Sequence, residues 1–239
     1  ALMVATLEDA RQLCLVADPE ARLLESHRRP IVLLERRPGA PAPDALAPGH
    51  AALGLMLPYT PLHHLLMRDL GFPVVATSGN RTDEPICTDN DEALARLGSI
   101  ADFFLLHDRP IVRPMDDSVM AVCEGGPVWM RRGRGMAPCT LPLPGVPDGW
   151  LAAGAQMKST VAVTAGGNAV MSSHIGDLDH EGAVRLWRRT VDDLAGLHGL
   201  DVVRAVADFH PDYASTRGAA ALPVPVESVL HHHAHASAL

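Results

Sequence analysis

Residues 73–80 read Pro-Val-Val-Ala-Thr-Ser-Gly-Asn, an apolar run followed directly by small hydroxyl and amide side chains. The apolar part predicts a short strand, and the polar part predicts the turn that ends it. Because ligands of open α/β sheets collect at the carboxyl ends of strands, Ser78 and Asn80 are candidate ligands of a phosphate group. Gly79 between them would let the backbone approach closely. An ordinary turn without a ligand has the same composition, so the residues alone leave both explanations open.

Helix and strand patterns alternate around this stretch. The expected strands are 30–34, 52–57, 73–77 and 103–106, the expected helices are 7–16, 61–70 and 89–97, and a hairpin is expected at 118–123 and 127–131. Thr6 and Asp9 form a capping-box pattern that opens the first helix. This mixed alternation favours a layered α/β domain, which we assign to residues 1–138.

A stretch rich in turn-forming residues follows. Residues 133–149 contain four prolines and four glycines, too many for a regular element, so we expect a linker at 139–150. The pattern restarts over residues 151–239. There the expected strands are 151–155, 160–165, 168–173, 202–208 and 224–230, and the expected helices are 181–198 and 212–220. Three strands, then a helix and a strand, resemble the opening of the actin-like ATPase fold.

Composition limits the class of protein. The chain has 239 residues, of which 47% are hydrophobic, and a formal net charge of −8, which predicts one or two α/β domains. The acidic balance argues against bulk nucleic-acid binding. No apolar run approaches the roughly 18 residues of a membrane span, so we expect a cytoplasmic protein with no membrane or nucleic-acid partner. The four cysteines include no Cys-x-x-Cys pair and predict neither a disulfide framework nor a zinc finger.

Arginines cluster near prolines and glycines in the first half. Arg131 and Arg134 lie at a strand end and in a glycine-broken turn, where guanidinium groups suit phosphate oxygens or simply face solvent. Arg109 and Arg113 flank prolines, which would present their charges rigidly. The Asp-Asp pair at 116–117 could hold Mg²⁺ or pair with these arginines, and we expect pairing.

Lys158 is the only lysine of the chain. It lies in the run 154–160, Gly-x-x-x-Lys-Ser-Thr, at an expected turn between two strands. Its ammonium and the Ser159 hydroxyl could bind a phosphate group at this turn. The run is not a Walker A loop, because the second glycine and the following helix are missing. An arginine-biased composition that leaves one lysine by chance is the alternative.

His231 and His235 are four residues apart, so on a helix they project from one face. Neutral imidazoles at this spacing suit Fe²⁺ or Zn²⁺. A purification tag is the alternative, but Ala234 and the residues after His235 interrupt a tag pattern. Two histidines do not complete a metal site.

Six motifs of this chain, in this order, resemble the HypF family of carbamoyltransferases that mature [NiFe] hydrogenases. They are TSGNRTDEPI, HDRPIVRPMDDSV, RRGRGMAP, HIGDLDH, DFHPDYAST and HHHAHASAL. The resemblance implies a YrdC-like mixed α/β domain at 1–138 followed by the first part of an actin-like (ASKHA) TsaD-like domain at 151–239. It also implies that the chain is a fragment of a longer protein.

The resemblance assigns roles to the candidate residues. Those expected to bind the nucleotide are Ser78, Asn80, Arg109, Arg113, Arg131, Arg134, Lys158 and Ser159. Lys158 and His174 are the candidate catalytic residues. His231 and His235 match the family's metal motif, whose remaining ligand is expected beyond Leu239. The family's usual Glu-Leu-Lys-Asn run is Gln-Met-Lys-Ser at 156–159 here, so the acid is lost while the lysine is kept.

The activity that the resemblance implies uses ATP, Mg²⁺ and carbamoyl phosphate. The YrdC-like domain would form carbamoyl adenylate, and the TsaD-like domain would pass the carbamoyl group to the C-terminal cysteine of HypE. Two alternatives remain. One is an antibiotic O-carbamoyltransferase, in which the two modules come in the reverse order. The other is a threonylcarbamoyl-adenylate module for tRNA modification, which the acidic balance and the fusion of both modules disfavour.

Overall fold

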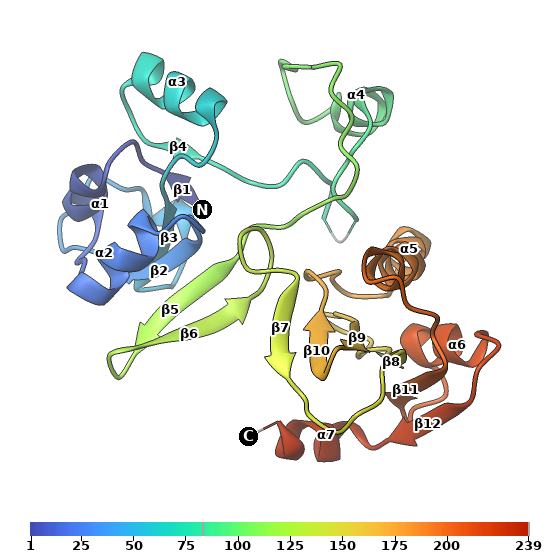
Figure 1. The fold of residues 1–239 in the computed structure, drawn as a ribbon. Coiled ribbons are helices and arrows are strands. Elements are labelled where there is room, and N and C mark those ends of the chain that lie inside the picture. Colours follow the sequence, from blue (N-terminus) through green and yellow to red (C-terminus); the bar gives the residue numbers. More distant parts are fainter. Residues whose placement is uncertain (83, 239) are drawn as a thin grey trace. The chain divides into compact units, whose positions relative to one another are not determined.

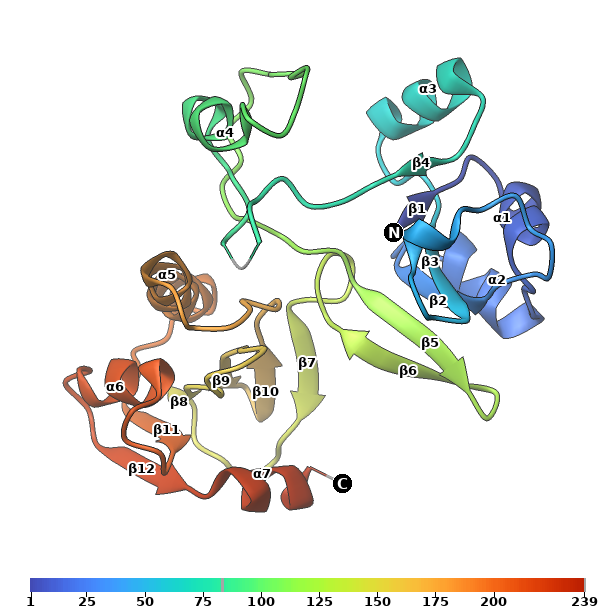
Figure 2. The ribbon, with the colours of Figure 1, turned by 180° about the vertical axis from the view of Figure 1, so that it is seen from behind.

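The computed structural model describes residues 1–82 and 84–238. These residues form two compact units, each built on its own six-stranded sheet (Figures 1 and 2). Residues 1–78 and 116–136 make the first unit, and residues 79–115 and those from Ala137 onward make the second. Both sheets mix parallel and antiparallel strands, so the expected mixed α/β class is confirmed. Within the described residues, no helix is long and apolar enough to cross a membrane.

The sheet of the first unit has the strand order β4-β1-β3-β2-β5-β6. Its strands are β1 (Leu2–Met3), β2 (Ile31–Glu35), β3 (Ala52–Met56), β4 (Val74–Val75), β5 (Val119–Cys123) and β6 (Gly126–Arg131). The accompanying helices are α1 (Leu7–Leu13), α2 (Asp18–Glu25), α3 (Pro61–Leu70) and the 3₁₀ turn Asp44–Leu46. The central strands bury Val32, Leu34 and Leu55 completely, which places the core of this unit around β2 and β3.

Local signals explain most of these elements. The Thr6 hydroxyl accepts a bond from the Asp9 N–H at 3.1 Å while Asp9 accepts from the Thr6 N–H at 3.0 Å, which is the expected capping box. The expected helix 7–16 ends early because Cys14 is extended and bridges to Arg36. Helix α2 was not predicted, since its N-cap, Ala17, has no side chain that can cap it.

The sheet of the second unit has the strand order β12-β11-β8-β9-β10-β7. Its strands are β7 (Cys139–Pro142), β8 (Trp150–Ala152), β9 (Ala162–Ala165), β10 (Asn168–Met171), β11 (Arg204–Asp208) and β12 (Val226–Val229). The helices are α4 (Asn90–Leu97), α5 (Glu181–Leu197), α6 (Ala214–Ala220) and α7 (His231–Ser237). Helices α5 and α6 pack on this sheet and on each other (Figure 1). The core centres on Trp187, whose indole N–H donates to the Ala153 carbonyl at 2.8 Å.

Two predictions about elements were wrong. The expected strand 103–106 does not form: these residues have no regular structure, and Phe103 is 93% exposed. Conversely, the turn-rich stretch assigned to a linker contains β7, which pairs with β10 along its whole length. Pro142 is tolerated there because β7 is the edge strand of its sheet, where a missing N–H costs no ladder bond.

Candidate active site

The carboxyl ends of three strands meet at one edge of the second sheet. Strand β11 runs parallel to both β8 and β12, so the segments that follow these three strands come out side by side. The residues there are Gly154, Asp208 and His231. Together with mostly small side chains, they line a pocket of about 340 Å³. The site is therefore of the kind in which α/β sheets hold ligands.

The two predicted metal ligands face each other in this pocket. The Nε2 atoms of His231 and His235 lie 3.1 Å apart on the first turns of α7, as the four-residue spacing predicted. The Nδ1 atom of His231 lies 3.1 Å from Oδ2 of Asp208, whose side chain is only 10% exposed. A carboxylate behind an imidazole fixes the ring and directs Nε2 toward a ligand. Imidazole nitrogens are donors that suit a divalent metal ion. Among the described residues, however, no group of three His, Cys, Asp or Glu side chains is placed to hold one, so the two histidines do not make a complete site by themselves.

Lys158 lies in the loop between β8 and β9. The loop begins at Gly154, whose φ is +74° and where a Cβ would lie 1.9 Å from the Thr160 carbonyl oxygen, so only glycine fits. Lys158 itself has φ of +49°, and its N–H donates to Oδ1 of Asp177 at 2.6 Å. The lysine side chain is exposed. Ser159 is only 1% exposed, and its hydroxyl has no hydrogen-bond partner in the described structure.

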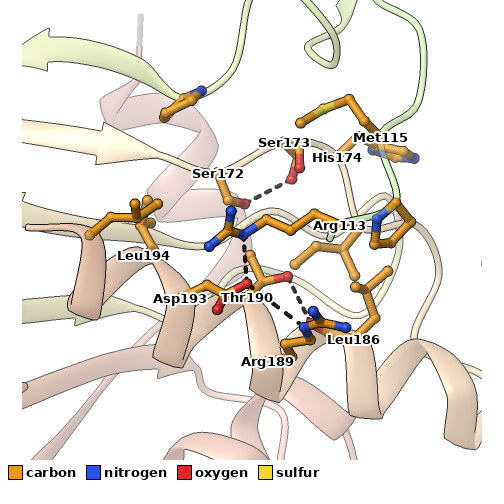
Figure 3. A pocket seen from close by; sticks show the side chains of 14 residues that line it. Arg113, Met115, Ser172, Ser173, His174, Leu186, Arg189, Thr190, Asp193 and Leu194 are labelled. Atoms are coloured by element: carbon orange, nitrogen blue, oxygen red, sulfur yellow. Dashed lines mark hydrogen bonds and ion pairs between the residues drawn. The ribbon is translucent and has the colours of Figure 1, made fainter. Parts of the chain in front are cut away.

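A second pocket of the same unit brings together Arg113 and His174 (Figure 3). It is mostly apolar and lies against α5. Arg113 donates through Nε to Oδ2 of Asp193 at 2.7 Å, and Arg189 donates to the Val112 carbonyl at 2.5 Å. Two candidate residues that are 61 positions apart in the sequence therefore share one cavity.

Comparisons with known proteins agree with this architecture. Residues 1–133 match the model of the Sua5/YciO/YrdC family, which is described as telomere recombination. The chain belongs to the Sua5/YciO/YrdC family. Residues 146–239 match the HypF Kae1-like domain, so the YrdC-like part is followed by a Kae1-like part, and the resemblance to HypF is confirmed.

The curated relatives are carbamoyltransferases named HypF. The Synechocystis protein is 45% identical over 218 residues, which cover 90% of this chain and 28% of that protein. The Rhizobium leguminosarum protein is 42% identical, over 100% of this chain and 32% of its own length. The chain thus spans about a third of the length of these relatives.

Two solved structures have the same fold. One is full-length HypF in its phosphate- and nucleotide-bound form, with a TM-score of 0.94 and 43% identity over 98% of this chain and 37% of that one. The other is HypF of T. kodakarensis, with a TM-score of 0.92 and 32% identity over 98% of this chain and 31% of that one.

In the YrdC-like part, the arginines at 131 and 134 are engaged with the two aspartates before them. Arg131 lies 3.6 Å from Oδ1 of Asp116, and Arg134 lies 2.8 Å from Oδ1 of Asp117. The two aspartates thus pair with arginines as expected, but Arg113, which lies just before them in the sequence, pairs with Asp193 instead. Arg134 also donates to the carbonyls of residues 28 and 29, at 3.0 and 2.8 Å. Its guanidinium carbon lies 3.3 Å from the centroid of the Tyr59 ring. Arg134 therefore connects several segments of this unit. Nothing in the sequence predicted its contact with Tyr59.

The Ser-x-Asn turn is divided between the units: Ser78 ends a segment of the first, and Asn80 belongs to the second. The Asn80 amide nitrogen donates to the carbonyls of Arg81 and Glu84, both at 2.9 Å, so it shapes its own turn. Arg109 is exposed.

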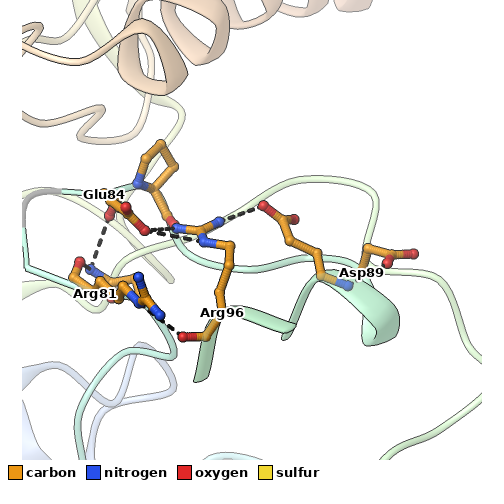
Figure 4. Close-up of polar contacts among 7 residues, drawn as sticks. Arg81, Glu84, Asp89 and Arg96 are labelled. Carbon is orange, nitrogen blue, oxygen red and sulfur yellow. Dashed lines mark hydrogen bonds and ion pairs between the residues drawn. The ribbon is translucent and has the colours of Figure 1, made fainter. Parts of the chain in front are cut away.

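Next to this turn, sequence reasoning missed a charged cluster (Figure 4). Arg96 contacts Glu84 and Glu92, and its backbone carbonyl accepts a bond from Nε of Arg81 at 2.9 Å. The contacts to Glu84 are the largest cause of a raised pKa at Arg96. The i, i+4 spacing of Glu92 and Arg96 on α4 was the one signal that could have revealed part of it.

Proposed function

We propose that this chain supplies the YrdC-like part and the first portion of the Kae1-like (TsaD-like) part of a carbamoyltransferase of the HypF type. In this proposal ATP and carbamoyl phosphate are the substrates, and the C-terminal cysteine of HypE, in the cytoplasm, accepts the carbamoyl group. The observation that carries the proposal is the meeting of Gly154, Asp208 and His231 at one pocket, in a segment that matches the HypF Kae1-like domain. The similar full-length HypF was solved with phosphate and a nucleotide bound, which supports the choice of ATP.

In the proposed chemistry, water first hydrolyses carbamoyl phosphate to carbamate and inorganic phosphate elsewhere in the intact protein, and two steps follow. First, a carbamate oxygen attacks the α-phosphorus of ATP, pyrophosphate leaves, and carbamoyl adenylate forms. Second, the cysteine thiolate attacks the carbamoyl carbon, AMP leaves, and a thiocarbamate remains. The protein must hold a labile mixed anhydride and neutralise its phosphate charge. Lys158 can do so as a mobile point charge because its side chain is exposed, and Arg109, which is also exposed, can do so through its planar guanidinium group.

The remaining candidate residues differ in what would have to change before their side chains could contact the nucleotide. We keep Ser78, Asn80, Arg113 and Arg131 as proposed contacts of the nucleotide. Arg134 would first have to release the carbonyls that it now binds. The Ser159 hydroxyl would have to become accessible, since it is buried now. In this proposal His174 acts in its pocket beside Arg113.

A metal ion would be held by His231 and His235, with Asp208 orienting the first of them. Such an ion, Fe²⁺ or Zn²⁺, would supply a Lewis acid for a bound oxygen atom. Mg²⁺ would accompany the phosphates of ATP. The chain's own part is to hold the two Nε2 atoms close together, with the Asp208 carboxylate orienting the ring of His231.

The test separates the two steps in the intact protein. Carbamoyl-phosphate-dependent exchange of pyrophosphate into ATP reports adenylate formation, and labelled carbamoyl transfer to a HypE C-terminal peptide reports the second step. We expect His231→Ala to keep the exchange and to lose at least about tenfold in transfer, since removing even the partners of metal ligands costs about 10- to 100-fold. His232→Ala, on another face of α7, is the matched control and should change neither rate. Loss of exchange in His231→Ala, or no exchange in the unmodified protein, would contradict the proposal.

A further inference from the structure

Gln156, in the loop that carries Lys158, bonds to two other segments of the second unit. Its side-chain Nε2 donates to Oδ1 of Asp179 at 2.8 Å. Its side-chain Oε1 accepts from the Ala214 N–H at 2.7 Å, and its backbone carbonyl accepts from the Leu178 N–H at 2.9 Å. One amide side chain therefore uses both its donor and its acceptor between two segments that are far apart in the sequence.

The first of these bonds joins the same two segments as the bonds that hold Lys158 in an unfavourable backbone conformation. A lysine with φ of +49° is in the left-handed region, which non-glycine residues seldom occupy. Three hydrogen bonds join this loop to residues 175–177. The Lys158 N–H donates to Asp177 at 2.6 Å. The Ser159 N–H donates to the Gly176 carbonyl, and the Ser159 carbonyl accepts from the Ile175 N–H, both at 2.8 Å. The bond from the Gln156 side chain to Asp179 joins an earlier part of the loop to the same segment.

The second tie reaches the segment after β11. Helix α6 begins behind Tyr213, which makes no side-chain capping bond, and the Ala214 N–H at its start is satisfied by Gln156 instead. The same helix holds the end of β11, because the Thr216 hydroxyl donates to the Asp208 carbonyl at 3.1 Å. Asp208 in turn contacts His231.

We propose that Gln156 is a positioning residue that couples the Lys158 loop to the Asp208 end of β11. Two segments that line the same pocket, around Gly154 and Asp208, are thereby held in one arrangement, and the backbone from which the Lys158 side chain projects is held with them. The coupling of the two segments is argued from the hydrogen bonds described above. Its consequence for nucleotide binding rests on the proposed function.

The bonding pattern explains why an amide is needed. Glutamate at 156 would keep the acceptor for the Ala214 N–H but would place a carboxylate against Asp179. Leucine would remove both bonds at nearly constant volume. Glutamate at 156 combined with asparagine at 179 would restore both bonds, because the asparagine amide donates where Gln156 now does.

The test compares Gln156→Leu, Gln156→Glu, and Gln156→Glu combined with Asp179→Asn, with Gln12→Leu as the matched control in α1. Hydrogen exchange at the amides of Ala214 and Lys158 reports the geometry. Calorimetry with ATP, in the intact protein, reports the affinity. We expect Gln156→Leu to lose about tenfold in ATP affinity and in protection at both amides, in line with the loss of a hydrogen bond or two. Gln156→Glu should lose protection mainly at Lys158, and the double variant should recover both measurements.

The two readouts separate the possible failures. Unchanged protection in Gln156→Leu, or no recovery in the double variant, would overturn the coupling. If protection follows the expected pattern while the unmodified protein does not bind ATP, the coupling stands and the proposed function is wrong. If Gln12→Leu changes the Ala214 amide as strongly as Gln156→Leu does, the effect is not local and the inference fails.

Discussion

At the scale of single residues, Arg134 stabilises the YrdC-like unit with three of its nitrogen atoms and its flat face. We predict that Arg134→Lys lowers the free energy of unfolding by about 2 kcal/mol, because a lysine can replace neither the fork of bonds to Asp117 and the two carbonyls nor the stacking on Tyr59. Urea unfolding measures the change. Arg132→Lys is the control, since Arg132 lies 5.6 Å from the Trp129 ring centroid in a looser contact. Equal effects of the two substitutions would contradict this view of Arg134.

His63 gives the same unit a pH dependence. Burial, and then the positive charge of Arg134, lower its pKa from the ordinary value of 6.5, while Asp117 acts in the opposite direction. Because the folded form binds the proton less tightly, the unfolded state takes up more protons as the pH falls through 6.5, and stability is lost. We predict that the midpoint of urea unfolding falls between pH 7.5 and 5.5, and that it falls less in His63→Leu. If the urea midpoint falls equally in the unmodified protein and in His63→Leu, the pH dependence comes from other titratable groups.

At the scale of elements, the turn after β8 depends on Gly154. Alanine there would place its Cβ 1.9 Å from the Thr160 carbonyl oxygen at φ of +74°, so the loop would have to move. We predict that Gly154→Ala costs at least about 2 kcal/mol of stability, more than the backbone penalty alone. Gly166→Ala is the matched control, because its φ is also positive, +56°, and nothing lies within 4 Å of the added carbon. It should cost only about 1 kcal/mol. Thermal melts of both variants give the comparison.

Local sequence signals alone did not decide which elements formed. Helix α3 has the bounds that the pattern predicted, yet its leucines at 62, 65, 66 and 70 are 38 to 49% exposed, while Met67 is buried. The hairpin β5–β6 turns through Glu124 and Gly125, both with positive φ, as a two-residue hairpin turn requires. The apolar run 103–106 had the composition of a strand but joins neither sheet.

At the scale of the whole molecule, each unit has its own core. Leu55 belongs to the core of the first unit, and Leu151 to that of the second. We predict that the units unfold in separate transitions, and that Leu55→Ala weakens the first unit by about 3 kcal/mol while leaving the second nearly unchanged. Leu151→Ala should do the reverse. Hydrogen exchange on peptides from each unit distinguishes the two, and equal loss of protection in both units would show a single cooperative fold.

The domain division at residue 138 and the roles of the candidate site residues stay predictions. No strand of either sheet crosses residue 138, because the last strand of the first sheet ends at Arg131 and the first strand of the second begins at Cys139. Residues 79–115, however, group with the second unit by their contacts.

What the sequence by itself determined is local or carried by motifs: the fold class, the capping box at Thr6, the helix 61–70, the hairpin, the shared face of His231 and His235, and the resemblance to HypF. The cap, the helix, the hairpin and the shared histidine face depend on neighbours within a few residues, whose geometry the backbone dictates. The fold class and the resemblance depend on patterns and motifs that can be recognised without knowing which segments touch. Only the tertiary structure decided that β7 joins the second sheet, that Ser159 is buried, that Arg134 stacks on Tyr59 and that Gln156 reaches Ala214. In each case the partner lies far away in the sequence. A hydrogen bond or a buried surface of that kind exists only once the chain has folded and brought the two together.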